Sequence, residues 1–216
     1  MSEQPDWVQL FRIACAMIRQ VNAEQEIIDH WTFGGGTAMM LQINHRESHD
    51  VDIFLTDAQF LGFLDPGKHD FAFEIRPSDY HGDGTGFLKL GFDFGEIDFI
   101  VGSSLTSSPT TEMEIESEIV LLETIPEVIA KKVYHRGNSI APRDIFDIAA
   151  GGEKHAESII KELASYPNRV ASALAAIDRL KPDFVNSTIG QLLIKDEYKS
   201  VAKMALGRTK EILEAV

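Results

Sequence analysis

The chain has 216 residues, 44% of them hydrophobic, and a formal net charge of −14. It is long enough to bury a core in one domain or in a small pair of domains. The acidity lies in residues 1–152, which carry 25 Asp and Glu against 10 Lys and Arg, whereas residues 153–216 carry 9 against 10. Such an acidic first part argues against broad non-specific binding to nucleic acid, which depends on clustered positive charge.

No apolar run approaches the roughly 20 residues that a membrane-spanning helix needs. The N-terminus lacks the basic start and apolar block of a secretory signal. The only cysteine, Cys15, cannot form an internal disulfide and lies among apolar residues, which is typical of a packed thiol in a reducing compartment. The sequence therefore predicts a cytoplasmic protein with no membrane segment.

Helical and extended patterns alternate in the first part of the chain. Helices are predicted over residues 4–29, 37–43 and 59–64, and strands over 29–33, 51–55, 71–75, 87–92, 94–101 and 112–119. Three glycines, residues 34–36, form a turn between the first strand and the second helix. The HGDGTG loop, residues 81–86, is interpreted as a hairpin connection; a second phosphate loop is the alternative, but no helix follows it.

From Pro126 the pattern is helical to the end of the chain. Helices are predicted over residues 126–137, 142–152, 154–165, 168–180 and 188–214. This order predicts an α+β fold, with a mixed sheet and flanking helices in residues 1–124 and an all-helical domain in residues 125–216.

Residues 33–55 combine two features that suit a metal-bound phosphate compound. A glycine turn that opens a helix can hold phosphate oxygens on backbone N–H groups. Asp50 and Asp52 lie two residues apart on one strand, so both carboxylates point to the same face and repel each other unless a cation or proton lies between them. Exposed strand aspartates are common, so the pair alone is also compatible with a solvated surface.

A third carboxylate on a neighbouring strand would complete a two-metal arrangement. Asp98 is the best candidate, and Glu96 on the same strand face is the reserve choice. Carboxylates together with substrate phosphate oxygens are the ligands that Mg²⁺ favours. Two other interpretations are weaker: His45 and His49 beside Asp50 lack a third zinc ligand at recognisable spacing, and the glutamates of residues 112–118 are typical of a solvated strand face.

The stretch GGGTAMMLQINHRESHDVDIFL resembles the signature of the polymerase-β-like nucleotidyltransferase superfamily: a glycine turn, a short helix, Asp-x-Asp and a later third acid. More narrowly, the GGT turn, the H-R-x-S loop at residues 45–48, AKKVYHRG at 130–137 and RDIFD at 143–147 resemble the AbiEii-like nucleotidyltransferase toxins. The motifs follow the family's order over about residues 30–150. The superfamily often has Gly-Ser where this chain has Gly-Gly-Thr, a departure that the AbiEii-like group tolerates.

The resemblance implies a nucleotidyltransferase-like sheet on which Asp50 and Asp52 are catalytic metal ligands. Asp98 would be a further metal ligand that positions or deprotonates the acceptor hydroxyl. The nucleotide-binding residues that it implies are Gly35, Gly36, Thr37, Arg46, Ser48, Lys131, Arg143 and Asp144.

In the helical domain, the resemblance implies that Lys132 binds triphosphate charge, with the adjacent Lys131 as the alternative. Asp147 would be a further catalytic residue, three positions after Asp144 on the same helix face. From the residues alone, the lysines would more often be solvated on a helix surface, and RDIFD could be a surface ion-pair cluster that contributes little to stability.

The function that this resemblance implies is transfer of a nucleoside monophosphate from a nucleoside triphosphate, with Mg²⁺, to a tRNA or protein hydroxyl. It also implies that the protein is the toxin of a toxin–antitoxin or phage-defence pair whose antitoxin is encoded separately. Two alternatives remain from the residues: a non-catalytic nucleotide-binding module, which would bind without turnover, and a metal-dependent phosphohydrolase, which would release free phosphate.

Overall fold

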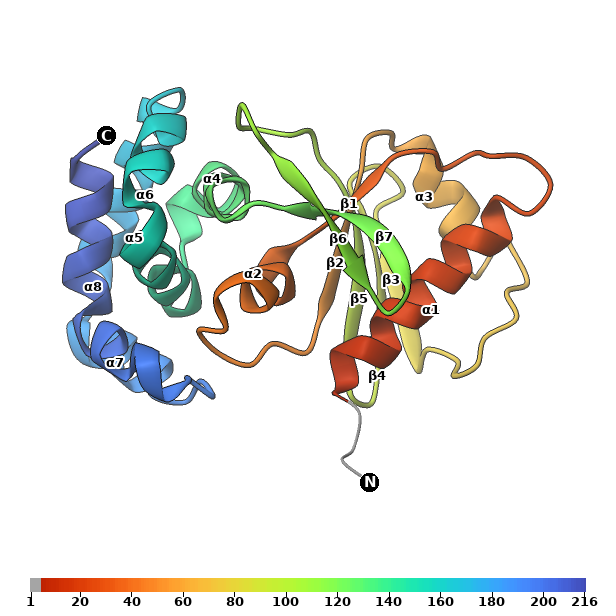
Figure 1. Cartoon of the computed structure of the whole chain (residues 1–216), viewed down its shortest axis with the longest axis horizontal. Coiled ribbons are helices and arrows are strands. Elements are labelled where there is room, and N and C mark those ends of the chain that lie inside the picture. Colours follow the sequence, from red (N-terminus) through yellow and green to blue (C-terminus); the bar gives the residue numbers. More distant parts are fainter. Residues whose placement is uncertain (1–4) are drawn as a thin grey trace. The chain divides into compact units, whose positions relative to one another are not determined.

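The computed structural model describes residues 5–216 (Figure 1). Its first eleven elements are α1 (Asp6–Val21), β1 (Trp31–Gly34), α2 (Gly35–Ile43), β2 (Val51–Leu55), α3 (Gln59–Leu64), β3 (Asp79–Gly82), β4 (Phe87–Phe92), β5 (Gly95–Val101), β6 (Thr110–Ile115), β7 (Glu118–Glu123) and α4 (Ile125–Arg136). The others are α5 (Pro142–Leu163), α6 (Pro167–Arg179), α7 (Pro182–Ile189) and α8 (Lys199–Glu214), with short 3₁₀ turns at Gly137–Ser139 and Asp196–Tyr198.

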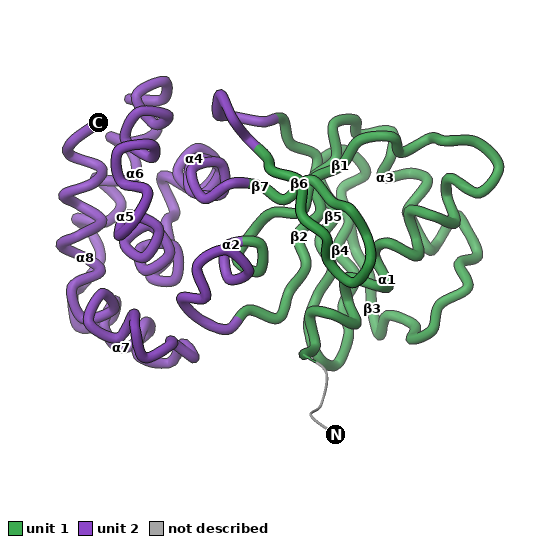
Figure 2. The backbone as a smooth tube through the Cα atoms, viewed as in Figure 1, with its two compact units in different colours: residues 1–38, 48–103, 110–123 green, residues 39–47, 104–109, 124–216 purple. Residues whose placement is uncertain are grey.

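The chain divides into two compact units (Figure 2). Unit 1 holds the described chain up to Ala38 together with residues 48–103 and 110–123. Unit 2 holds residues 39–47, 104–109 and 124–216. The division of the chain into domains at residues 124 and 125 stays a prediction.

Unit 1 contains a seven-stranded mixed sheet with the strand order β3-β4-β5-β2-β1-β7-β6. The pairs β2–β5 and β1–β7 are parallel, and the remaining neighbours are antiparallel. This mixed sheet, the helices that flank it and the helices of the C-terminal region confirm the predicted α+β fold class.

The two faces of this sheet differ in chemistry because successive strand residues point to opposite sides. On β2, Val51, Ile53 and Leu55 are fully buried. They belong to the face that packs against α1, where Phe11 stacks on Phe33 with the ring centroids 5.3 Å apart. The alternate residues of β2 and β5, which include the aspartates, therefore point away from this core.

Unit 2 has a separate core built from α4 to α8 and the end of α2. Helices α5 and α8 approach closely at Gly152, where a Cβ atom would lie 2.3 Å from Cδ1 of Ile212. The hydroxyl of the buried Thr209 on α8 also donates a hydrogen bond to the carbonyl oxygen of Ile145, with an O···O distance of 2.7 Å. Small residues and one internal hydrogen bond thus hold the two helices together.

In unit 1 the first predicted helix was too long, and the strand predicted over residues 71–75 was wrong. The helix predicted over residues 4–29 ends at Val21, because the Asn22 side chain accepts hydrogen bonds from the backbone N–H groups of Ile27 and Ile28 and folds the chain back. Residue 4 lies outside the described residues. Residues 71–75 form no strand: β4 pairs instead with residues 79–82.

The third correction in unit 1 concerns residues 112–119, which are not one strand. They contain a reversal between β6 and β7 at Glu116 and Ser117, whose φ angles of 51° and 68° are positive. Glutamate recurs at every second position through this turn, so the spacing of the acidic residues alone does not show it. The loop before β4 is a hairpin connection as predicted, closed by the Asp83 carboxylate on three backbone N–H groups.

In unit 2, Gly151 and Gly152 do not end a helix. Helix α5 continues to Leu163 with a local distortion at His155, where φ is −124° and ψ is 15°. The glycines are tolerated in mid-helix because they allow close packing against side chains such as Ile129 and Ile212. The long helix predicted over residues 188–214 was also wrong, since α7 begins at Pro182 and α8 only at Lys199.

Candidate active site

A row of residues in register crosses four strands of the sheet in unit 1. Lys89 on β4 lies opposite Asp98 on β5, Asp98 opposite Asp52 on β2, and Asp52 opposite Gly34 on β1. Neighbouring strands lie about 4.8 Å apart. The parallel pairing of β2 with β5 therefore sets two of the three predicted carboxylates side by side on the face away from the apolar core.

The glycine turn lies directly beside Asp52. Gly35 has a φ of 70°, and a Cβ atom there would be 1.7 Å from Oδ2 of Asp52. Gly36 follows in the first turn of α2, and the buried Thr37 donates its hydroxyl hydrogen to the carbonyl oxygen of Asp50. The turn and the Asp-bearing strand are thus connected by a hydrogen bond, and Gly35, the first residue of α2, lies against the Asp52 carboxylate.

Asp50 and Asp98 each have a partner on the same sheet face. Oδ1 of Asp50 accepts a hydrogen bond from the backbone N–H of Glu96 at 3.2 Å. Asp98 is 18% exposed, and burial raises the pKa of its carboxyl above 3.8; Glu96 and Asp50 add to that rise, and the nearby Lys89 opposes it. The electrostatic interaction between Asp50 and Asp98 indicates that negative charge is concentrated here.

Lys89 is a residue of this site that the sequence analysis missed. Its Nζ lies 3.2 Å from Oδ2 of Asp98 and also donates a hydrogen bond to Glu96. Burial lowers the pKa of Lys89, but these two carboxylates outweigh burial and raise it. The polar position within FLKLGF indicates which face Lys89 occupies, but the register of the β4–β5 hairpin is needed to place it opposite Asp98.

The carboxylates of this sheet face are of the type that holds a divalent metal ion. Among residues 5–216, no group of three or more His, Cys, Asp or Glu side chains is arranged to hold a metal. The donor chemistry nevertheless fits a hard cation, because Asp50, Asp52 and Asp98 share one face and supply only carboxylate oxygens. The ammonium group of Lys89 is already paired with one of these three acids, Asp98.

A second cluster of predicted residues lies within unit 2, centred on the fully buried Asp147. Its Oδ1 contacts Nε2 of His45 at 2.9 Å and Nε of Arg46 at 2.8 Å. Its Oδ2 contacts Nη2 of Arg46 and Nζ of Lys132, both at 3.0 Å. Arg46 therefore binds this carboxylate with two nitrogens, the strongest geometry for such a pair.

Asp144 extends this cluster along α5. It accepts hydrogen bonds from Nζ of Lys132 at 2.8 Å and from the backbone N–H of Ala141 at 3.2 Å, and it lies 3.4 Å from Nη1 of Arg136. Burial would raise the pKa of both aspartates, but the charge of Lys132 lowers the pKa of Asp144, and Lys132 with Arg46 holds that of Asp147 well below 3.8. RDIFD is therefore a buried charge network, and the alternative of a surface ion-pair cluster was wrong.

The other predicted residues have separate environments. Lys131 is buried, with its Nζ 3.7 Å from the Glu127 carboxylate, whereas Arg143 is exposed. Ser48 is half-buried in the loop before β2. His49 faces Asp6 at 3.3 Å, and His45 contacts Asp147, so the structure offers no support for the zinc alternative among the described residues.

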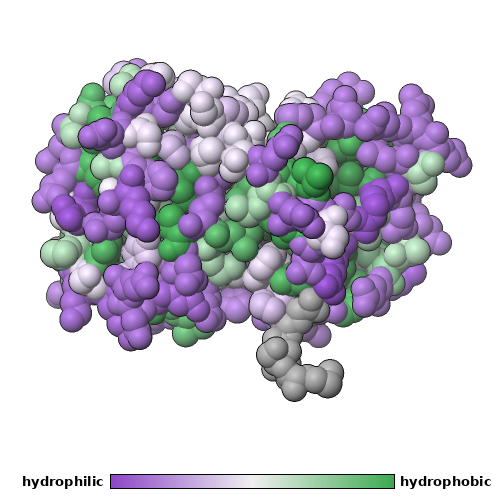
Figure 3. Space-filling model, viewed as in Figure 1, coloured by the Kyte–Doolittle hydropathy of each residue, from purple (hydrophilic) through white to green (hydrophobic). Residues whose placement is uncertain are grey.

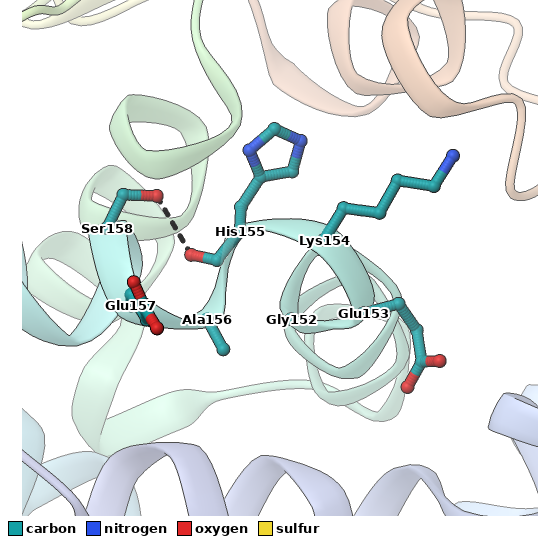
Figure 4. A pocket seen from close by; sticks show the side chains of 7 residues that line it. All are labelled: Gly152, Glu153, Lys154, His155, Ala156, Glu157 and Ser158. Atoms are coloured by element: carbon teal, nitrogen blue, oxygen red, sulfur yellow. Dashed lines mark hydrogen bonds between the residues drawn. The ribbon is translucent and has the colours of Figure 1, made fainter.

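A surface hollow of about 510 Å³ lies elsewhere, along α5 at Gly152–Ser158 (Figure 4). All of its lining residues are consecutive on one helix, around the distortion at His155. The side chains of Lys154 and His155 do not point toward a common centre in Figure 4. This hollow therefore lacks the convergent polar groups of a ligand site, and the sheet of unit 1 remains the better candidate.

The chain matches a protein-family model over most of its length. A family model described as "Nucleotidyl transferase AbiEii toxin, Type IV TA system" matches residues 18–207. The chain belongs to the AbiEii nucleotidyltransferase toxin family. It is accordingly a nucleotidyltransferase, as the order of the glycine turn, Asp-x-Asp, Asp98, Lys132 and RDIFD predicted. A comparison with curated proteins finds no match.

This AbiEii family member is similar to several solved structures, to different degrees. A candidate nucleotidyltransferase from H. pylori is similar with a TM-score of 0.51 and 17% identity, covering 99% of this chain and 96% of that one. JHP933 from Helicobacter pylori follows with a TM-score of 0.49 and 16% identity, covering 99% and 94%. The CD-NTase CdnG of Bradyrhizobium diazoefficiens, in complex with GTP, has a TM-score of 0.37 and 13% identity, covering 98% and 86%.

Hydrophilic residues cover most of the face shown in Figure 3. Within residues 5–216, none of the helices has both the length and the apolar composition that crossing a membrane requires.

Proposed function

We propose that the protein transfers a nucleoside monophosphate from a nucleoside triphosphate to a hydroxyl group of an RNA, such as tRNA, or of a protein, with Mg²⁺ as cofactor. The acceptor oxygen forms a bond to the α-phosphorus, and the bond from that phosphorus to the bridging oxygen breaks. Pyrophosphate leaves with the bonding electron pair, and the hydroxyl proton passes to Asp98 or to solvent.

The observation that carries this proposal is the register of the sheet. Asp52 and Asp98 are direct neighbours on parallel strands, and the Asp52 carboxylate lies against the Gly35 turn that opens α2. A phosphate held by the N-terminal N–H groups of α2 would be next to the carboxylates that would hold the cation.

The residues of unit 1 would divide the chemistry between them. Gly35, Gly36 and Thr37 would bind phosphate oxygens through backbone N–H groups. Asp50, Asp52 and Asp98 would hold the magnesium, which would supply positive charge to neutralise the phosphates. Asp98, which is half-buried beside Asp52, would also orient the acceptor hydroxyl.

The predicted site residues of unit 2 would support the structure around the site more than they would contact the substrate. Asp147 already pairs with Arg46 and Lys132 in the buried network. These pairs favour a structural role, in which the network holds the loop of residues 44–47 that leads toward β2. Direct contact of Lys132 with the triphosphate, and a catalytic role for Asp147, would require these pairs to open. Lys131, Arg143, Asp144 and Ser48 stay predicted nucleotide-binding residues.

The family description supports the biological part of the proposal. A type IV toxin acts within a toxin–antitoxin pair, so we infer that this protein is the toxin and that a separately encoded antitoxin opposes it. The nucleoside triphosphate donor would place the reaction in the cytoplasm.

The proposal is tested by incubating the purified protein with Mg²⁺, cell RNA or cell protein, and each nucleoside triphosphate labelled at the α- or γ-phosphate. We expect the α-label to enter a macromolecule and the γ-label to appear in pyrophosphate, with both processes stopped by EDTA. Release of the γ-label as free phosphate would indicate a phosphohydrolase instead. Absence of label transfer from every nucleotide would contradict the proposed activity.

A further inference from the structure

The Lys89 side chain is less exposed to solvent than is usual for a lysine on a protein surface. It is 27% exposed, and the side chain of its cross-strand neighbour Asp98 is 18% exposed. By contrast, Lys68 beside Asp65 is 62% exposed, which is typical of a solvated pair that contributes little. The ammonium group of Lys89 is thus partly withdrawn from water and held among acids.

Its contacts use most of its hydrogen-bonding capacity. Nζ lies 3.2 Å from Oδ2 of Asp98 and donates a hydrogen bond to Oε2 of Glu96, so two of its three N–H groups face carboxylates. Both acids belong to β5 and lie on the sheet face that also carries Asp50 and Asp52. Lys89 therefore supplies one positive charge at the edge of a group of four carboxylates.

We propose that Lys89 is a built-in counter-ion of this site, which neutralises Asp98 and Glu96 when no divalent cation is bound and competes with that cation for Asp98. This inference rests on the proposed function, because it assumes that Asp50, Asp52 and Asp98 bind a divalent ion. Lys89 acts through Asp98 and is a positioning residue. Its presence would limit binding of the ion until a nucleotide supplies further phosphate ligands.

A bound divalent ion and the Lys89 ammonium group would both carry positive charge. A divalent ion at Asp98 would lie close to the ammonium group and be repelled by it, so removal of the ammonium should strengthen binding of the ion. Removal should also lower the stability of the metal-free protein, because Asp98 and Glu96 would then repel each other with no positive charge between them. A purely structural lysine would produce the second effect without the first.

The test measures Mn²⁺ binding to the purified, metal-free protein by electron paramagnetic resonance, without nucleotide. We expect Lys89→Met to lower the Kd for Mn²⁺ about tenfold and to lower the Tm of the metal-free protein. Lys89→Arg keeps the charge and should bind Mn²⁺ like wild type. Lys68→Met is the matched control, since it removes an exposed lysine on the same unit, and it should change neither quantity.

The possible outcomes separate this inference from the proposed function. If wild type binds Mn²⁺, Asp52→Asn loses that binding, and Lys89→Met binds Mn²⁺ equally or more weakly, the metal site stands and the role of Lys89 is overturned. If neither wild type nor Lys89→Met binds Mn²⁺, the proposed metal site itself fails and the inference fails with it. Tighter binding by Lys89→Met, reversed in Lys89→Arg, supports the inference.

Discussion

At Gly35 the backbone has a positive φ, and the Asp52 carboxylate lies where a side chain would begin. Two independent constraints, conformation and space, therefore exclude any residue with a Cβ atom at this position. The same contact fixes the Asp52 side chain against the start of α2. One glycine thus determines the placement of a proposed metal ligand.

We expect Gly35→Ala to displace Asp52 and to lower nucleotidyl transfer about 100-fold, because a shift of about 1 Å in a reacting group can have that effect. The positive φ adds a loss of stability of about 1–2 kcal/mol. Transfer of α-labelled nucleotide and urea unfolding measure the two effects.

Gly62→Ala is the matched control for Gly35→Ala. Gly62 lies in α3, and a Cβ atom there would have no neighbour within 4 Å. Alanine should preserve activity and raise stability by up to about 1 kcal/mol. Equal activity in the two variants would mean that the Gly35–Asp52 contact does not matter for the reaction.

Several residues of the site could be predicted from the sequence because they depend on local spacing. Asp50 and Asp52 share a face through the two-residue period of a strand, and Gly35 opens a helix. The role of Lys89 could not be predicted, because it depends on the register of the β4–β5 hairpin. The role of His45 could not be predicted either, because it depends on a long-range contact with Asp147. The burial of Lys132 likewise follows from tertiary packing, which its lysine-rich motif does not reveal.

At the scale of elements, a buried charge network joins three segments of unit 2. Asp147 and Asp144 on α5 bind Lys132 on α4 and Arg46 in the loop after α2. Residues 193–195 support the same loop: the N–H of Glu47 donates to the carbonyl oxygen of Leu193 at 2.9 Å, and the N–H of Lys195 donates to that of His45 at 3.1 Å. The C-terminal region, which carries no recognisable motif, therefore stabilises the loop that precedes β2.

The lowered pKa values of Asp144 and Asp147 predict acid sensitivity. A carboxyl whose pKa is lower in the folded state stabilises the fold above its ordinary pKa, and that stabilisation is lost as the pH falls toward the folded value. We expect the free energy of unfolding in urea to fall as the pH decreases below about 4.

Asp147→Asn should reduce this pH dependence and destabilise the protein by about 3–5 kcal/mol at neutral pH, because it leaves the buried charges of Arg46 and Lys132 under-compensated. Asp178→Asn is the control, since Asp178 pairs with Lys210 at the surface and its side chain is 65% exposed. Identical pH slopes for Asp147→Asn and wild type would contradict the assigned role of the network.

Element types were easier to predict than their ends. Strand β2 and helix α3 have the predicted bounds because apolar periodicity and turn residues coincide there. Helix α5 passes through Gly151 and Gly152 because close packing overrides their low helix propensity. Strand β3 was missed because all four of its residues are exposed, so no apolar alternation marks it.

At the scale of the whole molecule, the family match extends beyond the motifs. The sequence motifs end near residue 150, whereas the family match continues to residue 207 and includes α6 and α7. These helices have no chemical signature because their contribution is a packed core, in which many apolar residues are interchangeable. The fold class could be predicted from the order of helices and strands. The family could be predicted from a few motifs that occur in the same order as in the family.

The central claim is that the acids paired across β2 and β5 form the catalytic centre. The most direct test compares the rates of α-label transfer by Asp52→Asn, Asp98→Asn and Glu112→Gln, the last a control at an exposed acid on β6. With equal Tm values, we predict that both asparagine variants lose at least about 100-fold in rate and that Glu112→Gln retains the wild-type rate. Transfer by Asp52→Asn at the rate of Glu112→Gln would contradict the account.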